Sequence, residues 1–171
     1  MNSIVKLITD INDRMCTILT KVIGVILGLI SVILFYSVVM RYVFNNPVTW
    51  TEDSANFLMV WMVLLGAPIG LRAGSHVSIE LLIEKLPQLI SKIVQTFVIL
   101  IIMYVCWIIL RYGWSFAMKG MRRIVPSLEW LKFGYAYMAL PVGYGLMILI
   151  CIEQLLKTSV SILSHQGKGE A

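Results

Sequence analysis

Residues 41–76 read RYVFNNPVTWTEDSANFLMVWMVLLGAPIGLRAGSH, and the placement of charge in this segment decides the fold. The charged residues lie near its two ends: Arg41, Glu52 and Asp53 on one side, Arg72 on the other. The 18 residues between Asp53 and Arg72 carry no charge. A helix that spans a bilayer needs about 20 mostly apolar residues. This stretch is therefore predicted to cross a membrane with its charges at the boundaries.

The composition of the whole chain supports the same conclusion. Of its 171 residues, 59% are hydrophobic and 13% are charged, and the mean hydropathy is +0.88. Soluble domains carry about 25% charged residues. The net charge of +5 then reflects the basic flanks of membrane spans. No segment resembles a nucleic-acid-binding module, so nucleic acid is not an expected partner, whereas membrane lipid is.

Four apolar runs are long enough to span, at residues 22–40, 54–71, 93–110 and 133–153. Each is predicted to be a helix, because lipid offers backbone groups no hydrogen-bond partner. The first run is too long for a signal peptide and lacks a small-residue cleavage site after it. The expected fold is an all-α integral membrane protein, with one four-helix domain over residues 1–164 and a disordered polar tail over 165–171.

Two shorter segments have the pattern of interfacial helices. Near the N-terminus, one helical face collects Ile4, Leu7, Ile8, Ile11 and Met15. This predicts a surface helix leading into the first span, although an early start of that span explains the pattern equally well. Residues 77–86 mix Ile and Leu with three charges and are followed by Pro87. They predict a short surface helix between spans two and three.

The distribution of basic residues indicates the orientation. Four spans place both termini on one side of the membrane. That side carries eight Lys and Arg residues, and the other side carries six. The flanks of the first span are more decisive, with Lys6, Arg14 and Lys21 before it and Arg41 after it. Because cytoplasmic flanks are enriched in basic residues, both termini are predicted to be cytoplasmic.

The start of the second span has two interpretations. Thr49-Trp50-Thr51-Glu52 fits a capping box with Thr49 as N-cap, and Glu52 and Asp53 then complement the helix dipole. Helix initiation alone accounts for both acids. In the second interpretation, Arg41 at the end of the first span also pairs with Glu52 or Asp53 and clamps the two helices together. Such a pair would be screened less at the membrane boundary than in bulk water.

Small residues recur at a spacing that allows helices to pack closely. Gly24 and Gly28 lie four apart in the first span, and Gly66 and Gly70 lie four apart in the second. Glycine at this spacing lets backbones approach within a membrane. Pro68 predicts a kink in the second span. The two pairs predict a tight hairpin of spans one and two, or a contact with another subunit.

The spans lack the residues that transport and catalysis require. Transporters mark their pathway with charged or histidine side chains inside the membrane, and the interiors of these spans have none. His76 and His165 lie outside the spans, and the three cysteines have no metal or disulfide spacing. We therefore expect no enzymatic activity, no metal or cofactor, and no substrate site in this chain. The sequence indicates a subunit of a larger assembly.

A set of residues resembles one family in particular. Its members resemble this chain at Arg41-Tyr42, at Trp50 with Glu52 and Asp53, at Gly66-Ala67, and at Arg72, Gly74 and His76. The pattern is similar to the small membrane subunit of tripartite ATP-independent periplasmic (TRAP) transporters, the DctQ/SiaQ-like Q subunits. Pro141 and Gly143 in the last span extend the resemblance over most of the chain. Asp53 departs from the family, which usually has Glu there.

The resemblance implies a function. A Q subunit accompanies a large membrane subunit, M, which carries substrate and sodium by an elevator-type movement in the bacterial inner membrane. A soluble periplasmic protein, P, delivers an organic acid such as a C4-dicarboxylate or sialic acid. Two alternatives remain from the residues alone. A small four-span multidrug exporter would need an acid near the middle of a span, which is absent here. The other alternative is a membrane anchor or assembly subunit of an unrelated complex.

Residues 111–132 form a basic segment. They hold five Lys and Arg residues against one acid, Glu129. With cytoplasmic termini this segment faces the periplasm. Lys119, Arg122 and Arg123 are then predicted to contact an acidic face of the binding protein. A basic turn that binds lipid phosphates is the alternative.

Overall fold

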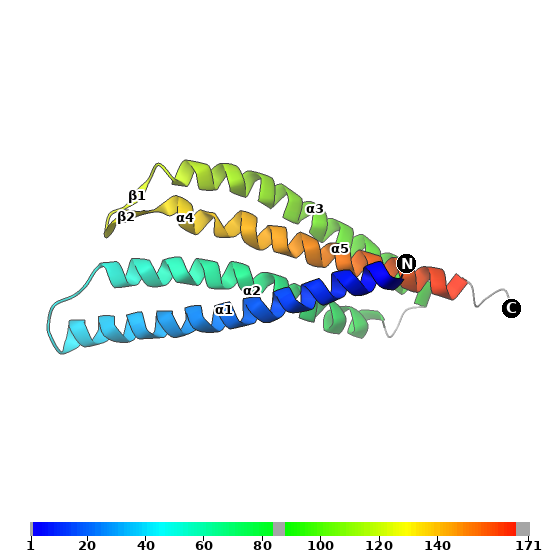
Figure 1. The fold of residues 1–171 in the computed structure, drawn as a ribbon, viewed down its shortest axis with the longest axis horizontal. Helices are drawn as coiled ribbons and strands as arrows, with labels where there is room; N and C mark the ends of the chain where they lie inside the picture. The colour runs from blue at the N-terminus through cyan, green and yellow to red at the C-terminus, as the bar shows by residue number, and fades with distance from the viewer. Residues whose placement is uncertain (1, 84–87, 167–171) are drawn as a thin grey trace.

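The computed structural model describes residues 2–83 and 88–166, with side chains described for residues 5–74 and 94–159. Figure 1 shows its elements, which are α1 (Asn2–Tyr42), α2 (Trp50–Ile83), α3 (Gln88–Gly120), β1 (Ile124–Val125), β2 (Leu128–Lys132), α4 (Phe133–Tyr137) and α5 (Ala139–Gln166). Four helical stretches are long and apolar enough to cross a membrane: Val5–Tyr42, Trp50–Gly74, Val94–Gly120 and Phe133–Ser159. The predicted four-span membrane protein is confirmed at this level.

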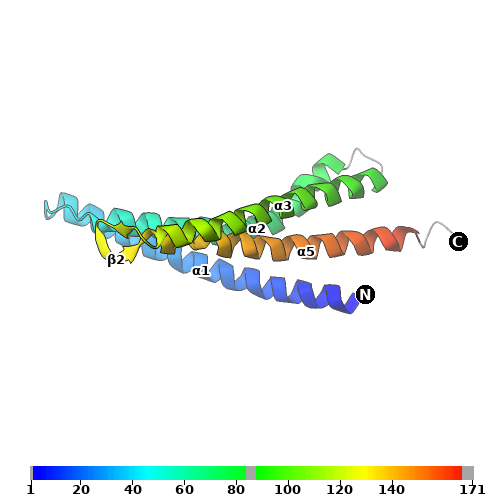
Figure 2. The same cartoon turned by 90° about the horizontal axis from the view of Figure 1, so that it is seen from above.

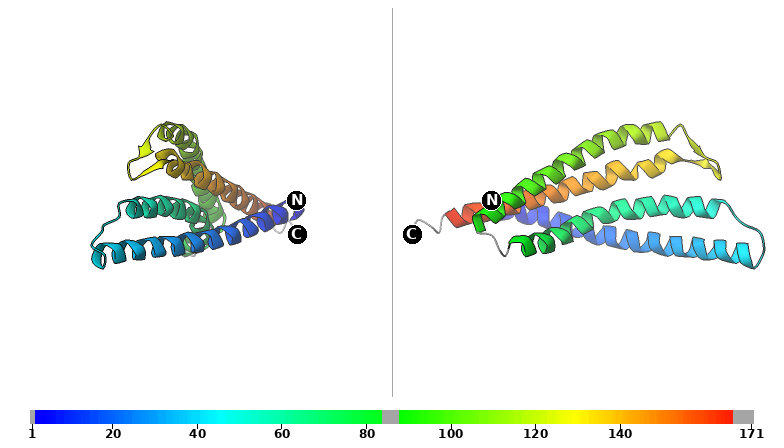
Figure 3. Two further views of the ribbon diagram at one scale, coloured as in Figure 1. Left: turned by 60° about the vertical axis from the view of Figure 1, so that its left-hand side comes forward. Right: turned by 180° about the vertical axis from the view of Figure 1, so that it is seen from behind.

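The helices form an open row. Helix α2 lies between α1 and α5, and α5 lies between α2 and α3. Figure 1 shows this order from bottom to top at the end where the chain turns from α1 to α2. Figure 2 and both views of Figure 3 place the start of α1 and the end of α5 at the opposite end. We call these the loop end and the terminal end.

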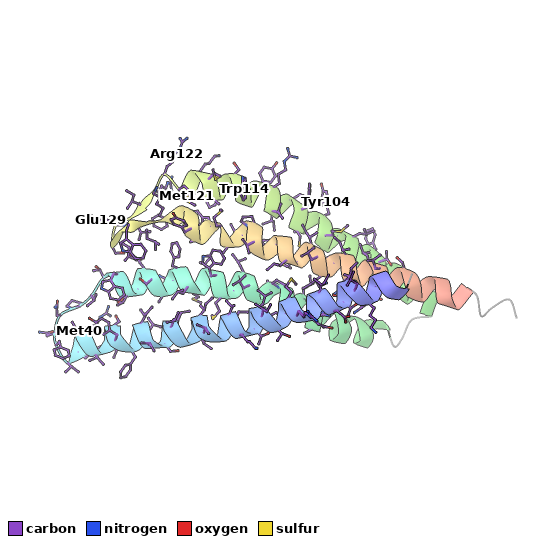
Figure 4. The ribbon with its side chains drawn as sticks, viewed as in Figure 1. Met40, Tyr104, Trp114, Met121, Arg122 and Glu129 are labelled. Atoms are coloured by element: carbon purple, nitrogen blue, oxygen red, sulfur yellow. The ribbon has the colours of Figure 1, made fainter. Side chains whose placement is uncertain are left out.

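Because the row is open, most of the surface of the spans is not buried within the chain. Only 6% of the most apolar window of the first span is buried within the chain, and the share rises to 28% in the fourth span. Figure 4 shows Tyr104 and Trp114 pointing away from the other helices on the outer side of α3. Lipid tails are as apolar as leucine, so lipid does not drive helices together as water does. A broad apolar surface is therefore stable against lipid or a membrane partner.

The interfacial helices differ from prediction. Helix α1 is continuous from Asn2 to Tyr42, so the N-terminal segment is the early start of the first span, not a separate helix. No proline or glycine precedes Gly24, and the apolar positions stay in phase with the span. In the predicted surface helix at 77–86, residues 77–83 continue α2. Residues 84–87 lie outside the described residues.

The all-α prediction misses a β-hairpin. Helix α3 continues to Gly120, ten residues past the predicted end of the third span. The chain then forms β1 and β2, which pair antiparallel at Val125 with Leu128 and at Ile124 with Lys132. Pro126 and Ser127 form the connection. Proline is tolerated there because the position needs no N–H for the strand pairing.

Two further details shape the loop end. Asn45, in the connection from α1 to α2, has φ 51°, a left-handed conformation that Asn adopts more readily than most residues. Helices α4 and α5 are separated at Met138. Pro141 follows closely, and it has no N–H to bond the carbonyl of Tyr137. Helix α5 extends to Gln166, so it includes the first two residues of the predicted tail, and residues 167–171 lie outside the described residues.

Candidate functional site

The first polar contact links α1 and α2 at the loop end. The Arg41 guanidinium donates from Nη2 to Glu52 Oε1 at 2.5 Å. Both side chains are about half exposed, at 49% for Arg41 and 59% for Glu52. Glu52 stands in the first turn of α2, where its charge also complements the helix dipole. Glu52 therefore both pairs with Arg41 and stands where its charge favours the start of α2.

Next to this ion pair, two hydroxyl side chains join the same helices. Thr51 is fully buried and donates from Oγ1 to Ser37 Oγ of α1 at 3.0 Å. The Thr51 hydroxyl also lies 2.9 Å from the carbonyl oxygen of Val48. The Trp50 ring lies against Tyr36, with centroids 6.1 Å apart. Helix α2 begins at Trp50, so Thr49 occupies the residue before the helix.

Asp53 has a different partner from the one suggested. Its carboxylate accepts a hydrogen bond from the hydroxyl of Ser127, at the tip of the β-hairpin. The Trp61 indole donates from Nε1 to the Tyr135 carbonyl oxygen at 3.1 Å. These two contacts fasten the hairpin and α4 to α2 across the loop end. The two acids that open α2 therefore bind in opposite directions, Glu52 to α1 and Asp53 to the hairpin.

A second polar group lies at the terminal end and centres on Glu153 of α5. We call it the Glu153 cluster, and its members are Asn12, Asp13, Arg72, Glu153 and Lys157. Glu153 is only 2% exposed. Its carboxylate accepts from Asn12 Nδ2 at 2.7 Å, from Arg72 Nη2 at 3.2 Å and from Lys157 Nζ at 2.5 Å. A buried carboxylate is stable only when it is paired and hydrogen-bonded in this way.

Arg72 extends the Glu153 cluster to α1. Its Nη2 lies 2.7 Å from Asp13 Oδ1 as well as 3.2 Å from Glu153 Oε1. One guanidinium thus bridges carboxylates on α1 and α5. The two acids and two bases of the cluster balance in charge. The cluster ties α1, α2 and α5 together at one point.

The two polar groups bracket a distance that matches a bilayer. Glu52 and Arg72 lie 20 residues apart on α2, or about 30 Å at a rise of about 1.5 Å per residue. The hydrocarbon core of a bilayer is about 30 Å thick. The loop-end contacts and the Glu153 cluster therefore lie at opposite boundaries of the span.

Most of the Glu153 cluster was not predicted from the sequence. Glu153 was expected at the end of the fourth span, and Asn12 and Asp13 had no predicted role. One signal was available: Asn12 lies between apolar residues on the face of α1 that continues into the span. An amide at such a position indicates a polar partner on a neighbouring helix. The side chain of His76, which is on α2, lies outside the described side chains.

The glycine pairs do not make the predicted close contacts within this chain. A Cβ added at Gly24, Gly28 or Gly70 would meet nothing within 4 Å, and at Gly66 it would meet only the tip of Ile23, at 3.8 Å. The close approach lies elsewhere, at Gly143 of α5. A Cβ there would lie 2.6 Å from the carbonyl oxygen of Leu64 on α2. Within this chain these four glycines therefore bring no backbones together, although α1 and α2 do pack against each other, and contact with another subunit remains a prediction.

The basic residues of the loop end are spread over two elements. Lys119 is in the last turn of α3, and Arg122 and Arg123 are in the turn before β1. All three side chains are exposed, and Figure 4 shows Arg122 pointing outward. The Arg123 carbonyl accepts from the Phe133 N–H at 3.1 Å, which fixes the turn. The hairpin thus presents basic side chains outward from a braced backbone.

A comparison with protein families identifies the family of this chain. A profile described as "Tripartite ATP-independent periplasmic transporters, DctQ component" matches residues 30–160. The chain belongs to the DctQ family. The match runs from the middle of α1 into α5. It includes Arg41, Arg72 and Glu153 but not Asn12 or Asp13.

Individual relatives agree with the DctQ assignment. A TRAP transporter small permease protein of Haemophilus influenzae is 29% identical over 143 residues, which are 84% of this chain and 88% of that protein. The C4-dicarboxylate TRAP transporter small permease protein DctQ of Vibrio cholerae serotype O1 is 33% identical over 67 residues, or 39% of this chain and 29% of the relative. The sialic acid TRAP transporter permease protein SiaT of Haemophilus influenzae is 31% identical over 121 residues, or 71% of this chain but 20% of the relative.

These matches decide between the alternatives left open by the sequence. As a DctQ protein, the chain is the small permease subunit of a TRAP transporter, a component of a transport system and not an enzyme. A multidrug exporter and an anchor for an unrelated complex are thereby ruled out. The relatives bear names with different substrates, so their similarity does not fix a substrate for this chain.

Proposed function

We propose that this chain is a non-transporting scaffold for the large membrane subunit, M, in sodium-coupled uptake of an organic acid. The observation that carries the proposal is an open row of helices with polar contacts at both boundaries. The loop-end contacts and the Glu153 cluster hold the row in shape, while little of the span surface is buried within the chain. A row of helices that is fixed at both boundaries and has broad apolar faces is suited to support a partner subunit that moves.

The length of one relative supports the partnership with M. This chain corresponds to 20% of the length of the sialic acid permease relative. The remaining part of that relative is covalently joined to a segment like this chain. In that relative the two parts are one chain. We infer that here they are two chains, so that this subunit associates with a separate, larger permease.

We infer an organic acid as the substrate class, delivered by a periplasmic binding protein. C4-dicarboxylate and sialic acid appear in the names of two relatives, and both substrates are carboxylates. Substrate and sodium sites belong to M in this proposal. The ion pairs and the Asp53 hydrogen bond described in this chain lie at the two membrane boundaries rather than along a pathway.

The proposed location is the bacterial inner membrane, with both termini in the cytoplasm. The excess of Lys and Arg on the terminal side supports this orientation, most directly Lys6, Arg14 and Lys21 before the first span. The loop end then faces the periplasm. Its basic side chains Lys119, Arg122 and Arg123, in the last turn of α3 and the turn before β1, are accessible to a binding protein that arrives with substrate.

Reconstitution tests the scaffold proposal. Proteoliposomes with a sodium gradient, loaded with binding protein and a radiolabelled carboxylate, would contain this chain alone, M alone, or both. We expect uptake only where M is present, and faster uptake with both chains. Sodium-driven uptake by this chain alone would refute the scaffold role. Equal uptake by M with and without this chain would do the same.

A further inference from the structure

A groove between α3 and α5 has no role in the contacts described so far. It has a volume of about 380 Å³ and lies in the loop-end half of the molecule. One part of its lining is apolar, with Ile108, Ile109 and Leu140. Tyr112, Ser115 and Lys119 also line it, with Gly113 and Phe116 among them, so most of the lining surface is apolar. The groove has one charged side chain, Lys119, at its end nearest the membrane boundary, which we call the polar end.

The dimensions of the groove match one leaflet of a bilayer. Ile108 and Lys119 are 11 residues apart on α3, or about 16 Å along the helix axis. Half of a bilayer's hydrocarbon core is about 15 Å. Trp114, directly before Ser115, and Trp130, on β2, are exposed in the loop-end half, as expected near a membrane interface. Ile108 and Ile109 therefore lie at the depth of acyl chains and Lys119 at the depth of headgroups.

The charge at the polar end is complementary to phosphate. Among the described side chains, Lys119 forms no ion pair, and its side chain is exposed. Residues 111–132 around it hold five basic residues and one acid. A phospholipid places an anionic phosphate at this depth and an apolar chain below it.

We propose that this groove holds one anionic phospholipid from the leaflet at the loop end. Its phosphate accepts from the Lys119 ammonium, and the Ser115 hydroxyl stands one turn deeper on the same helix. One acyl chain follows the apolar part past Ile109 to Ile108. The lipid would fill the outer side of the α3–α5 contact, where Gly113 meets Leu140 closely. This inference does not depend on the proposed substrate or on binding-protein docking.

Native mass spectrometry of the full chain in a mild detergent tests the site, with phosphatidylglycerol as the probe. We expect one tightly retained lipid per chain. Lys119→Gln should weaken its affinity about fivefold, and Ile108→Trp, which fills the apolar part, should abolish retention. Lys132→Gln is the matched control, because Lys132 is exposed at the same end but does not line the groove. Phosphatidylcholine should be retained less than phosphatidylglycerol.

Several outcomes would overturn the proposal. These are equal affinity in Lys119→Gln and Lys132→Gln, equal retention of phosphatidylcholine, or displacement of the lipid by inorganic phosphate. Loss of the lipid when M binds would show instead that the groove is a protein interface. Lys119→Gln alters one exposed side chain, so it tests the headgroup contact even where Ile108→Trp fails to fold.

Discussion

The carbonyl oxygen of Leu64 lies against the backbone of Gly143, only 2.6 Å from where a Cβ on that residue would be. Pro68 stands four residues after Leu64 and has no N–H to bond its carbonyl. The freed carbonyl of Leu64 therefore faces the backbone of a glycine on α5, where a larger residue would leave no room for it. Pro68 and Gly143 together allow α2 and α5 to pack closely in the middle of the membrane.

Gly143→Ala should therefore destabilise the chain. The added methyl group would collide with a backbone atom, which cannot rotate away, and we expect a loss of about 1–3 kcal/mol in the free energy of unfolding. Thermal unfolding of the full chain in detergent would measure it. Gly28→Ala is the control and should be neutral or slightly stabilising, since nothing lies within 4 Å of its Cβ. Equal losses for the two variants would contradict this role of Gly143.

The outward glycines of α1 give a separate prediction. If Gly24 and Gly28 contact another subunit, Gly28→Leu should leave the melting temperature of the isolated chain unchanged and reduce its co-purification with M. The reason is that a large side chain separates helices whose backbones must approach. Undiminished co-purification would show that this face of α1 contacts lipid.

Glu153 should contribute more to stability than Glu52. Glu153→Gln removes a buried charge and leaves cationic partners without it, and we expect a loss of about 3 kcal/mol. Glu52→Gln is the matched change at an exposed pair and should cost about 1 kcal/mol or less. The comparison uses unfolding of the full chain at one salt concentration. A larger effect for Glu52 would mean that the Glu153 cluster does not hold the three helices together.

The Arg41–Glu52 pair can be measured by a double-mutant cycle. Both side chains are half exposed, so we expect a coupling energy of about 0.5 kcal/mol, reduced at high salt. Arg41→Ala, Glu52→Ala and the double variant would be compared by thermal unfolding. Strictly additive losses would leave Glu52 with a role in helix initiation alone.

The basic hairpin gives a kinetic prediction. If Arg122 and Arg123 attract the binding protein, replacing both with Gln should slow uptake by the reconstituted transporter most at low binding-protein concentration and low salt. Long-range charge acts mainly on the association rate. A uniform change at every concentration, or none, would favour contact with lipid phosphates. Accessibility labelling that placed the hairpin in the cytoplasm would exclude docking and reverse the proposed orientation.

Much of the fold was predictable because lipid imposes simple rules. A long apolar run must be a helix in a membrane, so the four spans followed from hydropathy. Their true ends did not, because helices α1 and α3 continue past the apolar run where no proline interrupts them. The β-hairpin was missed because Ile124 to Lys132 is a short segment beside long helices. Its signal was β-branched residues followed by Pro126 and Ser127.

The polar contacts were predictable only where the partners are close in sequence. Arg41 and Glu52 are joined by a short turn, so their proximity could be inferred. Asn12 and Glu153 are 141 residues apart, and only the arrangement of the helices brings them together. The partner of Asp53 depended on the unpredicted hairpin. Close packing at Gly143 depended on which helix faces which, and glycine spacing within one helix does not contain that information.

The polar contacts at both boundaries also constrain the shape of α1. Asp13 and Arg41 are 28 residues apart on α1, a length of about 42 Å. Their partners Arg72 and Glu52 are separated by only about 30 Å on α2. The difference of about 12 Å is taken up by the reach of the two arginine side chains and by a tilt of α1 relative to α2. A tilted helix crosses less hydrocarbon than its length suggests, so α1 can be longer than α2 and still match the same bilayer. The tilt then depends on bilayer thickness, and activity with M should depend on acyl-chain length.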